Sequence, residues 1–163
     1  MRLRYKVLLA ALMGSLLIFT GAPAFATPPT GSGSTTILAN GTLTKAINAT
    51  TPVTGGNVTI RTKGALDVIV VEITLDPGAT TGWHSHTGPH FEVVKQGTLT
   101  EISAKGCKTE TFQAGQSDFD SSPGDVVIGV NHGTVPVTFV TTFIAPKGSV
   151  PRVDQPAPAN CPV

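Results

Sequence analysis

The residues best suited to chemistry in this chain of 163 residues are histidines, because three of its four lie in the segment His84–His90. On an extended chain His84 and His86 point to the same face, and the Gly88-Pro89 bend lets His90 return toward them. Neutral imidazole is a common protein ligand of transition metals. The spacing therefore predicts a metal site made of three imidazoles. The alternative is a former metal site that now lines an empty pocket.

Glu92 lies two residues beyond His90 and has the same strand parity. Its carboxylate is a candidate catalytic base, a candidate metal ligand, or a partner that holds an imidazole N–H. The other interpretation is an ordinary solvated charge on an edge strand. The sequence leaves these four roles open.

The N-terminus has the pattern of a targeting signal. Arg2, Arg4 and Lys6 precede an apolar run, and Ala24-Phe25-Ala26 matches a small-residue cleavage site. This predicts a signal peptide over residues 1–26, a secreted or periplasmic protein, and no membrane association after cleavage. A retained N-terminal anchor is the alternative.

Charge and cysteine content indicate which partners and which cellular compartment the protein has. The chain has 11 Lys and Arg against 10 Asp and Glu, with no basic cluster, so we expect no nucleic-acid partner. Its two cysteines, Cys107 and Cys161, are predicted to form a disulfide in an oxidising compartment. This bond would hold the Pro-rich tail of residues 150–163. Two free thiols are the alternative.

Short runs rich in Val, Ile and Thr alternate with turns that contain Gly or Pro, and no long helical periodicity is present. This pattern predicts an all-β domain, either a sandwich, a jelly roll or a small barrel. The domain is expected over residues 37–149, after a flexible segment at residues 27–36. The predicted strands are Asn57–Thr62, Asp67–Leu75, Phe91–Gln96, Thr98–Ser103, Glu110–Gln113, Val126–Val130 and Thr138–Ile144.

The histidine segment resembles the first conserved motif of the cupins. Its members are Gly78, His84, His86, His90 and Gly97, where the position of His90 is normally Glu. The stretch from Gly82 to Pro89 and the ending Asn160-Cys161-Pro162 are similar to small secreted bacterial cupins of the type-2 conserved barrel family. The resemblance covers about residues 58–163. It implies a double-stranded β-helix, the cupin jelly-roll barrel.

The second cupin motif is degenerate in this chain. Pro123-Gly124 and Asn131 match it, but the position of the fourth ligand is occupied by Val127, which cannot bind a metal. Asp125 has the strand parity to reach inward and is one candidate replacement. His132 is another, although its parity turns it away from the cavity.

The resemblance implies one divalent transition metal held by His84, His86 and His90, with open positions for water or substrate. Three imidazoles favour Fe, Ni, Cu or Zn over harder ions. The expected function is an oxygenase, such as a dioxygenase, or a lyase that acts on a small organic molecule. The alternatives are a non-catalytic module that binds a metal or small ligand, and a structural cupin. A homodimer is a further expectation from the family.

Overall fold

The computed structural model describes residues 26–121 and 123–163, so the predicted signal peptide lies outside the described residues except for Ala26. The described part forms twelve strands and no helix, which confirms the all-β prediction. Accordingly, it contains no helix with the length and hydrophobicity to cross a membrane. The strands are β1 (Gly33–Leu43), β2 (Asn48–Val53), β3 (Gly56–Arg61), β4 (Leu66–Leu75), β5 (His84–His86), β6 (His90–Gln96), β7 (Thr98–Ser103), β8 (Lys108–Gln113), β9 (Ser117–Asp120), β10 (Val127–Val130), β11 (Val137–Pro146) and β12 (Arg152–Asp154).

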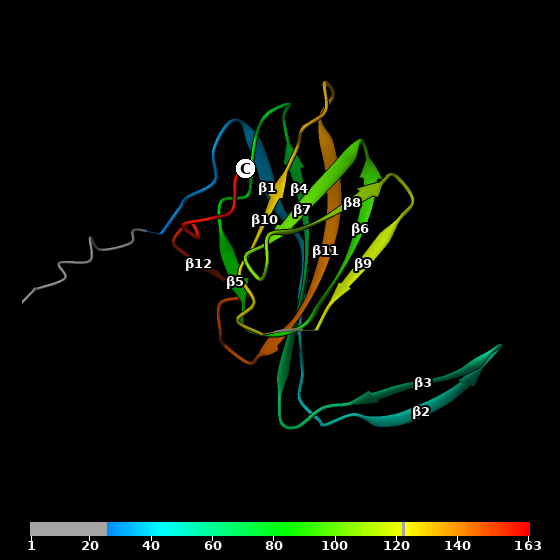
Figure 1. Cartoon of the computed structure of the whole chain (residues 1–163). Coiled ribbons are helices and arrows are strands. Elements are labelled where there is room, and N and C mark those ends of the chain that lie inside the picture. The colour runs from blue at the N-terminus through cyan, green and yellow to red at the C-terminus, as the bar shows by residue number, and fades with distance from the viewer. Residues whose placement is uncertain (1–25, 122) are drawn as a thin grey trace, which may run out of the picture.

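Two antiparallel sheets of five strands face each other and form the barrel (Figure 1). One sheet has the order β1-β4-β11-β6-β9 and the other has the order β12-β5-β10-β7-β8. From β4 to β7 and from β8 to β12 the chain alternates between the sheets. This alternation is that of a double-stranded β-helix, so the predicted jelly-roll fold is confirmed.

The barrel core follows from strand parity. In β11 every second residue is buried, beginning at Val137, and the residues between them are partly exposed. Phe139 and Val94 pack in this core with Leu99 from the opposite sheet. The apolar side of each strand therefore closes much of the space between the sheets. Polar side chains are buried beside the histidines, and Asn131 is buried where it donates to the carbonyl oxygens of Leu75 and Val135.

A second cluster of buried apolar side chains consists of Trp83, Ile102, Ile128 and Val130. Leu99 and Ile102 have opposite parity on β7, so the second sheet buries side chains on both faces. The C-terminal tail supplies part of the cover, since Cys161 packs against this cluster.

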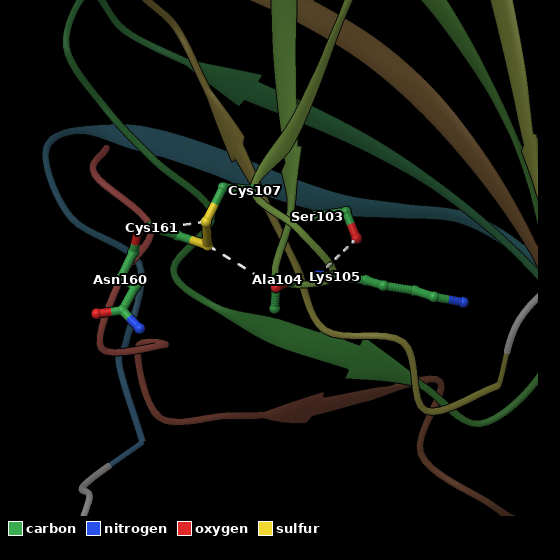
Figure 2. Close-up of a disulfide and its surroundings, with 6 residues drawn as sticks. All are labelled: Ser103, Ala104, Lys105, Cys107, Asn160 and Cys161. Atoms are coloured by element: carbon green, nitrogen blue, oxygen red, sulfur yellow. Dashed lines mark hydrogen bonds between the residues drawn. A yellow bond between two sulfur atoms is a disulfide. The ribbon is translucent and has the colours of Figure 1, made fainter.

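The predicted disulfide between Cys107 and Cys161 is present, with an S–S distance of 2.01 Å and a sequence separation of 54. Figure 2 shows how it joins the tail to the turn after β7, with Asn160 and Ala104 beside the two sulfur atoms. The tail is also held by β12, which pairs with β5. The tail is thus an integral part of the barrel wall.

Two features differ from the sequence-based boundaries. β1 begins at Gly33, inside the segment of residues 27–36 that was expected to be flexible, and its pairing with β4 orders this part. β2 and β3 form a hairpin that projects from the barrel and has only exposed residues (Figure 1). The signal-peptide boundary stays a prediction.

Candidate metal centre

The three histidines converge at one end of the barrel. His84 and His86 are on β5, and His90 is the first residue of β6 in the facing sheet. The ring centroids of His84 and His86 are 4.8 Å apart, and those of His86 and His90 are 4.4 Å apart. All three side chains are buried. The three rings are therefore neighbours, as their spacing led us to expect, and whether they bind one ion stays a prediction.

Two glycines allow this segment to approach neighbouring backbone. Gly82 has a φ of 68°, and a Cβ at this position would lie 2.4 Å from the carbonyl oxygen of Thr27. A Cβ at Gly88 would lie 2.0 Å from the carbonyl oxygen of Ile144. Side chains at either position would push the histidine strand away from the barrel.

Backbone carbonyls fix the orientation of two rings. The Nδ1 of His84 lies 2.8 Å from the Gly82 oxygen, and the Nδ1 of His86 lies 3.0 Å from the Pro151 oxygen. A carbonyl oxygen only accepts hydrogen bonds, so both Nδ1 atoms carry the proton. The Nε2 atoms of His84 and His86 consequently keep their lone pairs, which is the arrangement of metal-binding imidazoles.

His90 and Glu92 each contain a buried polar atom without a hydrogen-bond partner, namely Nδ1 of His90 and Oε1 of Glu92. The other carboxylate oxygen of Glu92 accepts a hydrogen bond from Thr141. Buried polar groups are normally satisfied, so these two atoms point to a missing partner. Within residues 26–121 and 123–163, however, no three His, Cys, Asp or Glu side chains are already arranged to hold an ion.

The histidines line a chamber of about 60 Å³, which is room for about two water molecules. Val127 is part of its wall, as the degenerate second motif implied. Asp125 and His132 are exposed and do not line the chamber, so neither replaces the missing fourth ligand there. The chamber is lined by Ile73, Thr81, His84, His86, His90, Glu92, Leu99, Glu101, Val127, Gly129, Phe139, Thr141, Phe143 and Arg152.

Burial shifts the titration of the chamber residues toward their neutral forms. It lowers the pKa of His84 to about 3, aided by the positive charge of Arg152, and it lowers the pKa of His86 to about 4. The pKa of His90 is also lowered by burial. Burial raises the pKa of Glu92 to about 8, and the nearby charge of Glu101 adds to this. Near neutral pH the three imidazoles are therefore uncharged.

Glu101 is a second inward carboxyl group, on β7, and its pKa is raised to about 7 by burial and by the negative charges of Asp118, Asp120 and Glu110. A carboxyl group whose pKa is raised on folding keeps a proton that the unfolded chain loses. Its contribution to stability is complete below about pH 4.5 and is lost as the pH rises toward 7.

We therefore predict that Glu101→Gln increases the free energy of unfolding of the metal-free protein at pH 8 and changes it little at pH 4.5. The expected difference between the two gains is about 1–3 kcal/mol, because one pKa unit corresponds to about 1.4 kcal/mol. Urea unfolding at both pH values measures it. The control is Glu72→Gln, because Glu72 is outside the chamber and pairs with Lys95. An equal gain at both pH values would contradict the prediction.

Three residues contribute to the chamber that the sequence analysis did not identify. They are Arg152 and Glu101, which line it, and Pro151, whose carbonyl oxygen accepts a hydrogen bond from His86. Arg152 lines the chamber and pairs with His86 across β12 and β5. The sequence held one sign of a special role for Arg152, because it is the only basic residue after Lys147.

No protein-family model matches the chain, and no curated protein is significantly similar to it. Solved structures that are similar to the chain include cupin and double-stranded β-helix proteins. A double-stranded β-helix protein from Klebsiella pneumoniae is 20% identical, with a TM-score of 0.47 over 69% of this chain and 86% of that one. A Cupin 2 conserved barrel domain protein from Salinispora arenicola is 18% identical, with a TM-score of 0.43 over 49% and 64% of the two chains. The polyketide cyclase RemF from Streptomyces resistomycificus is 19% identical, with a TM-score of 0.46 over 56% and 63%.

Proposed function

We propose that the protein is an exported metalloprotein that binds one divalent transition metal through His84, His86 and His90. Its function would be that of an oxygenase or lyase acting on a small organic molecule. The observation that carries this proposal is the pair of buried imidazoles on β5, whose Nδ1–H groups are held by carbonyls and whose Nε2 atoms are free to bind an ion. The disulfide supports export, because such bonds persist in oxidising compartments.

The residues present fit a transition metal. Three neutral nitrogen donors suit Fe, Ni, Cu or Zn, and an ion would give the orphaned Nδ1 of His90 a partner. Because the donors are not already gathered around one point, binding includes a rotation of at least one ring. The Nδ1 of His90 has no hydrogen bond, unlike the Nδ1 atoms of His84 and His86, so a rotation of this ring breaks none at that atom.

A bound ion would supply Lewis-acid or redox chemistry, and the chain would supply shape and a proton carrier. Glu92 is the candidate acid or base, because its Oε1 has no partner and its side chain lines the chamber. Thr141 holds the other oxygen and so fixes the carboxyl plane. The small chamber excludes bulk water from these groups.

Capture of a metal without turnover is the second candidate function. It is favoured by the volume of about 60 Å³, which accommodates an ion with few additional atoms. Such a protein would bind the ion and show no reaction with organic molecules.

Metal analysis of protein purified without a histidine tag tests the proposal. After incubation with Fe, Ni, Cu or Zn and removal of the excess, we expect about one equivalent of one metal per chain. Less than about a tenth of an equivalent for all four would contradict metal binding. With metal bound, oxygen consumption and product formation with phenolics, diketones and thiols distinguish an enzyme from a binder, and no turnover would favour capture.

A further inference from the structure

A larger groove adjoins the histidine chamber. Its volume is about 470 Å³, which is within the usual range for small-molecule sites of about 300–1,000 Å³. The groove and the chamber share part of their walls, so they are neighbouring compartments. The shared residues are Ile73, Thr81, Phe143 and Arg152.

The groove is apolar because β1 extends one sheet beside the barrel mouth. β1 is the end strand of its sheet, and all of its residues are exposed. Ile37 is 66% exposed and faces this groove. The aliphatic and aromatic side chains in the wall are Ile37, Ile69, Val71, Ile73, Leu75 and Phe143.

The side chain of Arg152 lies where the groove meets the chamber. Arg152 is the only Lys or Arg among the residues that line either compartment. Its Nη2 donates to the carbonyl oxygen of Thr81, and both its Nε and its Nη2 pair with the carboxylate of Asp154. These bonds leave the Nη1 donors for another acceptor, and guanidinium groups pair well with carboxylates.

The burial and the size of the chamber decide where an anion can stay. Beyond Arg152 the chamber is buried, which disfavours a charged group, and it holds only about two water-sized groups. An anionic group is thus favoured beside Arg152 and disfavoured deeper inside. The bulk of the molecule attached to it can fit only in the groove.

We propose that the groove binds a medium-chain aliphatic carboxylate, with its carboxylate at Arg152 and its chain along the apolar wall beneath β1. This inference deepens the proposed function, since the carboxylate end would then be presented to the histidines. The substrate class would be monoanionic and amphipathic. Short dicarboxylates would not use the groove.

Calorimetric titration of metal-free protein with butyrate, hexanoate, octanoate and decanoate tests the proposal. We expect the affinity to rise about two- to fourfold per added methylene, as the chain buries apolar surface. Decanol should bind at least about tenfold more weakly than decanoate, because a hydrogen bond to a charged group is lost. In the variant Arg152→Gln, with folding checked by circular dichroism, decanoate and decanol should bind about equally.

The apolar wall is tested with a matched pair of variants on β1. Ile37→Ser should weaken decanoate binding about three- to tenfold and leave butyrate nearly unchanged. Leu38→Ser is the control, because Leu38 is 53% exposed and does not line the groove. Both residues are exposed, so neither change should prevent folding.

An affinity independent of chain length would overturn the proposal. So would a dimer in sedimentation experiments that Ile37→Ser dissociates and that binds no carboxylate, because a second copy would then cover the groove. The titrations use metal-free protein, whereas the proposed function is judged by metal content. A failure of one is therefore distinguishable from a failure of the other.

Discussion

Replacing His84 and His86 together by Ala should abolish transition-metal binding and leave the barrel folded. Loss of a group that merely orients a ligand lowers metal affinity about 10–100-fold, so loss of two ligands should lower it by roughly a thousandfold or more. Both side chains point into a chamber and are not part of the apolar core clusters. Elemental analysis after reconstitution measures the retained metal, and circular dichroism checks the fold.

The fourth histidine provides the control for this experiment. His132 is exposed and lies outside the chamber, so His132→Ala should retain about one equivalent of metal. Equal retention by the double variant and by His132→Ala would mean that any bound metal is held elsewhere, and it would remove the proposed function.

The proximity of the three histidine rings was predictable because it depends on local geometry. The i, i+2 spacing of His84 and His86 fixes one face of β5, and the Gly88-Pro89 bend returns the chain at His90. The positions of strands such as Asp67–Leu75 and Thr98–Ser103 were also predictable from the sequence. A run of β-branched residues between turns that contain Gly or Pro favours a strand over any other structure.

The contributions of the tail were not predictable in the same way. Pro151 accepts a hydrogen bond from His86 across 65 positions in the sequence, and such a contact leaves no local pattern. Arg152 reaches the chamber only because β12 pairs with β5. Both depend on the register of a three-residue strand in a Pro-rich segment, where sequence patterns are weak.

Glu101 was missed for a different reason. Residues Leu99 and Ile102 on β7 are both apolar and have opposite parity, so the sequence does not indicate which face of the strand is inside. The structure resolves this because the tail buries Ile102 on the outer face of the barrel. Leu99, and with it Glu101, then faces inward.

The disulfide should be the largest single contribution to stability in the tail. In the variant Cys107→Ser/Cys161→Ser we expect the free energy of unfolding to fall by about 4 kcal/mol, because the unfolded chain regains the entropy of a long closed loop. Urea unfolding of both proteins at the same pH measures the change. The control is Lys105→Ala, an exposed position in the same turn that does not contact the tail (Figure 2).

The same variant should also disturb the candidate site, because the disulfide fastens the segment that orients His86. Cys161 packs against the Trp83 cluster, so its release uncovers apolar surface and weakens the attachment of β12 to β5. In the variant, the amide protons of Arg152–Asp154 should therefore exchange faster than in the disulfide-bonded protein. Exchange in β11 should change less, because β11 pairs with β4 and β6 and not with the tail. If stability falls while exchange in β12 stays unchanged, the bond stabilises the chain only through its unfolded state, and His86 is held in place by the β5–β12 pairing alone.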